Sequence, residues 1–346
     1  MKYTFTILRK IYGVSLVMSM AALLALGADK ATAGQIATIS DLGTLPGGTF
    51  SVGTGINGRD EVVGYAFTAS QQYHAFLYHD GAMADLGTLP GGNYSVAAGI
   101  NSRGQVAGFA IAASGNLHAF LYENGAMTDL GTLPGGSVSV GKAINNRGQV
   151  AGYAYPANSD LRAFLYDHGA MNELGTLPGG SFSAAIGIND PGQVVGYATN
   201  ANGQYHAFLY DHGVMTDLGA LPGGGNSFAN CINAQGQVVG QSQTASGNTH
   251  AFLYDHGVMT DLGTLPGGSN SSASGINARG QMVGYSQTSN GDSHAILYDH
   301  GVMMDLGLLP GGRNSYATSI DNEGKVSGVA YTASGAGHAV VWTLAH

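Results

Sequence analysis

The chain has 346 residues, of which 10% are charged, and its 21 acidic residues outnumber its 12 basic residues, so that the formal net charge is −9. This acidic balance argues against nucleic acid or an anionic membrane surface as a partner, because both reward clustered lysine and arginine. The single cysteine, Cys231, excludes an internal disulfide, so stability must come from burial, which a chain of this length can supply.

The first 33 residues have the pattern of a secretory signal peptide. Three basic residues, Lys2, Arg9 and Lys10, precede an apolar run over 11–26, and Ala31-Thr32-Ala33 fits a cleavage site. A transmembrane helix is the alternative, but the run is shorter than the roughly 20 residues that a bilayer requires. We therefore expect a mature chain from Gly34 that is secreted, to the periplasm or outside the cell, without a membrane anchor after cleavage.

An octet, DLGTLPGG, recurs with small changes at a constant spacing of 44 residues. It divides residues 34–346 into seven repeats. The copies begin at Asp41, Asp85, Asp129, Glu173, Asp217, Asp261 and Asp305. A fixed period of this length indicates a solenoid, a propeller or a related array.

Turn residues divide each repeat into four segments of strand length. In the fifth repeat the segments are 227–233, 237–241, 250–254 and 258–262, separated by Asn-x-x-Gly, Asp-His-Gly and similar turns. No segment has a helical period. Four antiparallel strands in about 44 residues are typical of a propeller blade, and seven blades lie within the usual range. A β-solenoid with two coils per repeat is the main alternative.

The two ends of the repeat array favour a closed ring. The last repeat ends four residues after HAVVW at 338–342, too early for a fourth strand, whereas 38–42 aligns with the fourth strands of the other repeats. We therefore expect Thr38–Leu42 to complete the seventh blade. The predicted fold is all-β, a seven-bladed β-propeller whose ring is closed by the N-terminal strand, and closure leaves no exposed edge.

The tripeptide His-Ala-Phe opens the third strand of four repeats. The copies lie at 74–76, 118–120, 206–208 and 250–252. In this respect the chain resembles the bacterial extracellular repeat proteins of the HAF family, over essentially all of residues 34–346. Repeat three departs from the tripeptide with Arg162, repeat six with Ile296 and repeat seven with Val340. The resemblance implies export and a repeat architecture, and it carries no catalytic residue over to this chain.

A cation and an acid recur at fixed positions in every repeat. The third strand starts with histidine, or with Arg162 in repeat three, and an acid follows 11 residues later near the end of the fourth strand. In repeat three both members change, to arginine and glutamate, which is what a direct contact predicts. The expected pairs are His74 with Asp85, His118 with Asp129, Arg162 with Glu173, His206 with Asp217, His250 with Asp261, His294 with Asp305, and His338 with Asp41.

We interpret these pairs as hydrogen bonds that fix each blade. Metal binding is an alternative, although one histidine and one aspartate per blade fall short of a complete site. Acid–base catalysis is a second alternative, which a pair repeated around a whole ring supports poorly. No catalytic residue, metal site or cofactor is therefore predicted.

A serine opens the first strand of every repeat. The same face of that strand ends in asparagine, from Asn57 to Asn277, and in Asp321 in the last repeat. We expect these small side chains to let the blades approach one another near the axis. A serine hydrolase is disfavoured, because no G-x-S-x-G motif is present.

Differences between repeats gather in the loops from strand four to one and from strand two to three, which leave an up-and-down blade at the same end. There the first four repeats carry apolar residues, and the last three carry polar ones. The candidate ligand-binding residues are Phe50, Tyr94, Phe182, Tyr73, Tyr205, Asn226, Asn270 and Asn314. Aromatic rings beside amides suit a carbohydrate and equally suit a protein partner. Two repeat subtypes left by duplication would give the same pattern.

These observations predict an exported, non-catalytic binding scaffold for an extracellular polysaccharide or a cell-surface protein. A polysaccharide lyase or hydrolase is one alternative, but the variable loops hold only two carboxylates, Asp160 and Asp292, in blades that are not adjacent. A structural surface component is the other alternative, and it would associate with itself without any ligand.

Overall fold

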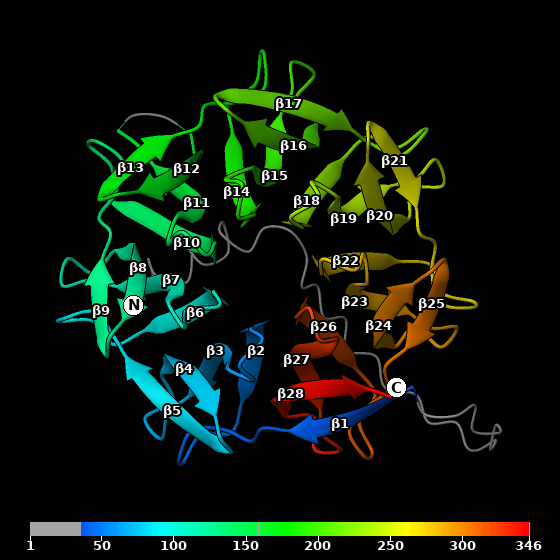
Figure 1. The fold of residues 1–346 in the computed structure, drawn as a ribbon, viewed down its shortest axis with the longest axis horizontal. Coiled ribbons are helices and arrows are strands. Elements are labelled where there is room, and N and C mark those ends of the chain that lie inside the picture. Colours follow the sequence, from blue (N-terminus) through cyan, green and yellow to red (C-terminus); the bar gives the residue numbers. More distant parts are fainter. Residues whose placement is uncertain (1–35, 158–159, 346) are drawn as a thin grey trace. The chain divides into compact units, whose positions relative to one another are not determined.

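The computed structural model describes residues 36–157 and 160–345, and the predicted signal peptide lies outside them. The described residues form 28 strands in seven four-stranded antiparallel sheets, which stand around a ring like the blades of a propeller (Figure 1). The fold is a seven-bladed β-propeller, as predicted. Within these residues there is no helix that could span a membrane.

In the first six blades the four strands lie in sequence order from the axis outwards, and in the seventh blade the outermost position is taken by the first strand of the described chain. The innermost strands are β2 (Ser51–Ile56), β6 (Ser95–Ile100), β10 (Val138–Ile144), β14 (Ser183–Ile188), β18 (Ser227–Ile232), β22 (Ser271–Ile276) and β26 (Ser315–Ile320). The second strands are β3 (Val62–Phe67), β7 (Val106–Ile111), β11 (Val150–Tyr155), β15 (Val194–Thr199), β19 (Val238–Gln243), β23 (Met282–Gln287) and β27 (Lys325–Tyr331).

The third strands are β4 (Tyr73–His79), β8 (Leu117–Glu123), β12 (Arg162–Asp167), β16 (Tyr205–Asp211), β20 (Thr249–Asp255), β24 (Ser293–Asp299) and β28 (Gly337–Leu344). The outermost strands are β5 (Ala82–Gly87), β9 (Ala126–Asp129), β13 (Ala170–Glu173), β17 (Val214–Gly219), β21 (Val258–Asp261), β25 (Val302–Asp305) and β1 (Ala37–Asp41). We number the blades from one, with β2 to β5, to seven, with β26 to β28 and β1.

The seventh blade joins the two ends of the repeat array. Strand β1 pairs antiparallel with β28, from Ala37 opposite Leu344 to Asp41 opposite Val340. The predicted closure is confirmed, with the strand displaced by one residue from the expected 38–42. In Figure 1 the blue strand β1 and the red strand β28 lie side by side in this blade.

Each innermost strand contains a one-residue bulge, and a glycine opposite it allows the strands to approach closely. In blade one the register shifts between Gly53 and Gly55. A Cβ atom added to Gly64 would lie 1.8 Å from the Val52 carbonyl oxygen and 2.9 Å from the Phe76 ring. Side chains larger than hydrogen are therefore excluded at this position, which is glycine in all seven blades.

The core lies between neighbouring blades. The phenylalanine of the third strand is fully buried in the first five blades. In blade seven the smaller Val340 takes its place, and the fully buried Trp342 stands where the other blades have tyrosine. The Trp342 ring lies 2.8 Å from a Cβ added to Gly328, and the Phe76 ring lies at the similar distance of 2.9 Å from a Cβ added to Gly64, so the larger ring fills the space left by the smaller side chain.

Candidate binding face

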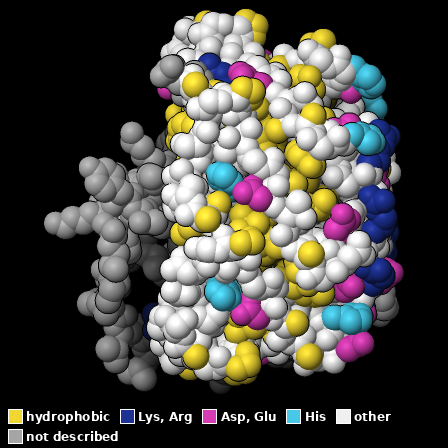
Figure 2. Space-filling model, turned by 90° about the vertical axis from the view of Figure 1, so that its left-hand side faces the viewer, with side chains coloured by type: hydrophobic (Ala, Val, Ile, Leu, Met, Phe, Trp, Pro, Cys, Tyr) yellow, Lys and Arg dark blue, Asp and Glu magenta, His cyan; other side chains and the backbone are white. Residues whose placement is uncertain are grey.

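All seven predicted cation–acid pairs are in contact. The histidine Nδ1 atoms lie 2.6 to 2.9 Å from the aspartate carboxylates, and Arg162 Nε lies 3.0 Å from Glu173. The pairs lie at the outer wall, where cyan and magenta side chains adjoin at intervals in Figure 2. The hydrogen bond from His294 to Asp305 raises the pKa of His294, against the lowering effect of burial.

Each histidine–aspartate pair belongs to a circuit of hydrogen bonds that crosses to the next blade. In blade one, His74 donates to Asp85, and the other oxygen of Asp85 accepts from the Gly87 N–H. The Gly87 carbonyl accepts from the hydroxyl of Ser95 in blade two, and Ser95 Oγ accepts from the Ala75 N–H at 2.8 Å. The pair therefore orients a turn to which the next blade is bonded.

The same hydrogen bonds explain why a serine stands near the start of the first strand in every blade. All seven serines are fully buried, and each donates to a glycine carbonyl and accepts from an alanine N–H. A hydroxyl bonded in this way holds two blades together and does not face a substrate. Cys231 is half-buried, and burial raises the pKa of its thiol, which disfavours the reactive thiolate.

The predicted aromatic residues gather in two clusters at the end of the ring that carries the strand 4–1 and 2–3 loops. The first aromatic cluster consists of Phe50, Tyr65, Phe67, Tyr73, Tyr94 and Phe109. The second aromatic cluster consists of Phe182, Tyr197, Tyr205 and Phe228. The apolar residues that the first four blades carry in these loops therefore do not form one continuous exposed surface, because Leu117, Val138 and Leu161 between the clusters are buried.

The predicted residues contact one another across the seams between blades. Tyr73 and Tyr94 make an edge-on contact, with ring centroids 6.0 Å apart. Phe50 covers Gly337 of blade seven, where an added Cβ would lie 2.7 Å from the ring. Four of the five aromatic candidates, Phe50, Tyr73, Tyr94 and Phe182, are half-buried, and only Tyr205 is exposed, at 36%.

The three asparagines of the polar half cap the third strand of the preceding blade. The side-chain carbonyls of Asn226, Asn270 and Asn314 accept the backbone N–H groups of Tyr205, Thr249 and Ser293, each at 2.9 Å. Part of the difference between the two halves therefore follows from packing at the seams. The Asn226 amide nitrogen also donates to Gln243.

Several aromatic residues of this face were not predicted. Phe228 stacks on Tyr205, with ring centroids 5.9 Å apart, and Tyr285, Tyr316 and Tyr331 form a third group in blades six and seven. The strand register could have revealed Phe228, because it places this residue opposite Gln241 on the second strand of its blade. Burial, and then the neighbouring phenols, raise the pKa of Tyr197 to about 12, so it stays protonated.

The opposite end of the ring has a hollow at its axis and carries most of the basic side chains. A hollow of about 260 Å³ lies at the axis, formed by the last residue of each innermost strand and the two residues after it, which in blade one are Ile56, Asn57 and Gly58. Basic side chains gather along one edge in Figure 2. Of the eight basic residues in the described part of the chain, four lie in the loops between the first and second strands, Arg59, Arg103, Arg147 and Arg279, and Lys325 is the first residue of the second strand of blade seven.

One innermost strand carries a lysine. Lys142 is the bulge residue of β10, where blades one, five and seven carry Thr54, Asn230 and Thr318. Those three side chains donate to backbone carbonyls of the next blade. Burial lowers the pKa of Lys142.

Solved structures share this fold at low sequence identity. The chain matches the β-propeller domain of the Trilobed protease from Pyrococcus furiosus with a TM-score of 0.55 and 10% identity, covering 89% of this chain and 95% of that one. It also matches a puromycin-hydrolyzing peptidase of Mycobacterium tuberculosis, with a TM-score of 0.56 and 13% identity, covering 85% of this chain and 51% of the peptidase.

A third match is an acylaminoacyl peptidase of Pyrococcus horikoshii, with a TM-score of 0.52 and 12% identity, over 85% of this chain and 51% of that one. No protein-family model and no curated protein matched the sequence. Similarity at this level of identity establishes the propeller fold alone.

Proposed function

We propose that this chain is an exported, non-catalytic binding module, whose ligand lies on the strand 4–1 and 2–3 end across the seam between blades four and five. The main support for this proposal is the position of Tyr205. This residue is the most exposed of the predicted aromatic residues, at 36%, and it stacks on Phe228 of the next blade. Asn226 and Gln243, joined by a hydrogen bond, lie at the same seam.

A carbohydrate is the ligand that fits this seam best. Sugar rings present C–H groups that stack on an aromatic face, and they present hydroxyls that bond with amides. The seam offers both kinds of group within one patch. The first aromatic cluster, around Tyr73 and Tyr94, is a second stacking surface on the same end of the ring.

Three observations support a non-catalytic role. The ring serines have their hydrogen bonds made within the scaffold, the histidines and aspartates are paired with each other, and the pKa of the Cys231 thiol is raised. In residues 36–157 and 160–345 we therefore identify no nucleophile held beside a base. Export, and membership of the HAF family, belong to the proposal and are supported by the N-terminal pattern and the repeated tripeptide.

The test is binding of the purified protein to a broad array of glycans and polysaccharides. The variant Tyr205→Thr/Phe228→Ser places in this seam the residues that the next blade carries, Thr249 and Ser272, so the fold should tolerate it. We expect the native protein to bind and the variant to lose at least tenfold in affinity, which corresponds to about 1.4 kcal/mol.

The matched control is Val258→Thr, which removes an exposed apolar side chain at 62% exposure from the start of an outermost strand. It should bind like the native protein. Absence of binding by the folded native protein, or equal binding by the seam variant, would contradict the proposal and direct attention to a protein partner or to self-assembly. Release of new reducing or unsaturated ends from a bound polysaccharide would instead indicate an enzyme.

A further inference from the structure

A chain of amide hydrogen bonds runs around the axis at the end that carries the strand 1–2 loops. Each blade contributes the residue that follows its innermost strand. In blade two, Asn101 Oδ1 accepts the N–H groups of Arg103 and Gln105, and Asn101 Nδ2 donates to the Asn145 carbonyl of blade three at 3.0 Å. The inter-blade bond is repeated at six seams, from Asn57 through to Asp321.

The seventh seam, between blades seven and one, breaks this chain. Asp321 Oδ1 accepts the N–H groups of Glu323 and Lys325, as an asparagine would. Its Oδ2 therefore takes the place of an amide nitrogen and has no proton to give to the Asn57 carbonyl. Asp321 is only 6% exposed, and Oδ2 has no hydrogen-bond partner among the described residues.

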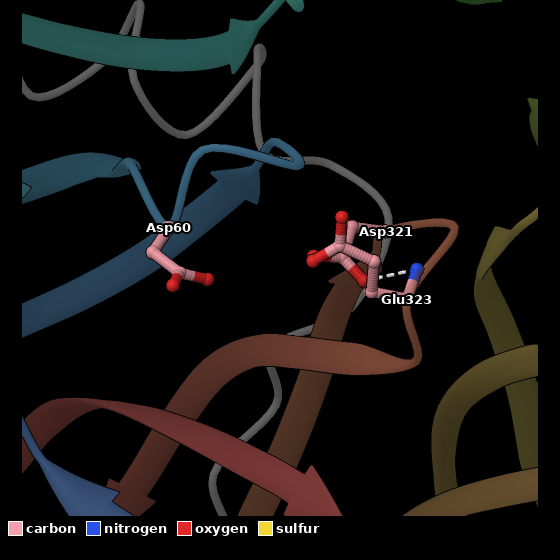
Figure 3. A group of neighbouring side chains, drawn as sticks. All are labelled: Asp60, Asp321 and Glu323. Carbon is pink, nitrogen blue, oxygen red and sulfur yellow. Dashed lines mark hydrogen bonds between the residues drawn. The ribbon is translucent and has the colours of Figure 1, made fainter.

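Two further carboxylates lie close to the carboxylate of Asp321. Asp60, Asp321 and Glu323 each offer an oxygen within 4.8 Å of the others (Figure 3). Asp60 stands where the other six blades have glycine, at a φ of 61° that favours glycine. Glu323 stands where four blades have arginine. Both departures from the repeat add negative charge at the seam that joins the first blade to the last.

One ammonium group faces these three carboxylates. The Lys325 ammonium contacts the Asp60 carboxylate. In five blades the position of Lys325 is glutamine, which accepts a hydrogen bond from the asparagine amide. At the closing seam the lysine leaves Asp321 Oδ2 without a partner, so it does not replace the missing donor.

We propose that this seam is a binding site for a divalent cation, Ca²⁺, held by the carboxylates of Asp60, Asp321 and Glu323. Calcium is bound by oxygen ligands at about 2.3–2.6 Å, so ligands on opposite sides of one ion lie about 5 Å apart, which matches the spread of these oxygens. Mg²⁺ fits less well, because it requires a smaller and more regular shell. The ion would join blades seven and one where the amide chain cannot.

The test is calcium binding to the purified, chelator-treated protein. Calorimetric titration measures the affinity, and the midpoint of thermal unfolding measures the stabilisation. We expect a dissociation constant of about 0.1–1 mM, as in extracellular calcium modules, and a midpoint that rises by a few degrees in 10 mM Ca²⁺. Magnesium at the same concentration should shift the midpoint less.

Three variants restore the residues of other blades and give distinct results. Asp321→Asn completes the amide chain, so it should raise the calcium-free midpoint and abolish the calcium response. Asp60→Gly removes one ligand and should weaken calcium binding at least tenfold. Lys325→Gln removes the competing cation and should strengthen calcium binding. The matched control, Asn101→Asp, creates an aspartate at a seam without the other acids, and it should lower the midpoint without a new calcium response.

Two results would overturn the proposal. The first is a native midpoint that does not respond to calcium, in which case a stabilising Asp321→Asn would mean only that the ring contains a misplaced acid. The second is an unchanged calcium response in Asp321→Asn and Asp60→Gly, which would place the ion elsewhere. Neither result bears on ligand binding at the other end of the ring.

Discussion

His338 and Asp41, 297 residues apart in the chain, are joined by a hydrogen bond of 2.8 Å. It closes the seventh blade in the same way that a local pair closes each of the others. Asp41 lies on β1, which this blade receives from the other end of the chain, so the bond links the start of the propeller to its finish.

Asp41→Asn should lower the free energy of unfolding by about 1 kcal/mol, because it removes the carboxylate charge from a hydrogen bond whose partners are partly exposed. The matched control is Asp261→Asn, which makes the same change to the pair within blade five. Because β1 is joined to its blade without a covalent hairpin, amide exchange should accelerate in β1 after Asp41→Asn more than it does in β21 after Asp261→Asn. Equal acceleration in both strands would show that closure adds nothing to the local pair.

Ser183→Ala should destabilise the protein by about 1–3 kcal/mol, because it leaves the buried Ala163 N–H without an acceptor. Denaturant unfolding measures this cost. Ser181→Ala, at an exposed site two residues earlier, is the control and should change stability by less than about 0.5 kcal/mol. If Ser183→Ala abolished ligand binding while leaving unfolding unchanged, the structural role of the first-strand serines would be wrong.

His294→Arg/Asp305→Glu should make the stability of blade six less dependent on pH, since it copies the Arg162–Glu173 pair of blade three. The Asp305 hydrogen bond raises the pKa of His294 above its ordinary value of 6.5, so the histidine contributes stability below that pH and loses the contribution as pH rises through its folded pKa. Denaturation at pH 5 to 9 measures the difference between the native and double-variant profiles. Parallel profiles would contradict the assignment.

Lys142→Thr should stabilise the protein at neutral pH. Burial lowers the folded pKa of Lys142 below its ordinary value of 10.5, so the charged amine costs free energy below the folded pKa, and the cost disappears as pH rises past 10.5. The advantage of the variant should therefore be larger at pH 7 than at pH 10.5, as denaturant titrations at both values would reveal. If the advantage did not change with pH, the gain in stability would come from the smaller volume of the side chain and not from the loss of its charge.

The regular spacing of the repeat made the fold and the paired residues predictable. Once four strands occupy 44 residues, the register that sets His206 near Asp217 follows in every blade, and the missing fourth strand predicts the place of β1. Contacts between blades were harder to foresee, because the sequence pattern does not reveal that Asn226 caps the N–H of Tyr205.

The acids of the proposed cation site were missed for a related reason. Asp60 and Asp321 lie at opposite ends of the array and become neighbours only when the ring closes. Each also looks like a minor deviation from its own repeat. Their meaning depends on the seam that they share, which an alignment of repeats does not display.

The most direct test of the proposed function is hydrogen exchange of the protein with and without the glycan that binds it best on the array. The account predicts slower exchange in 200–206 and 224–228, on the two sides of the seam around Tyr205, and no change in the strand 1–2 loops such as 57–61. Protection confined to 57–61 and its equivalents would place the ligand in the axial hollow at the opposite end and contradict the account.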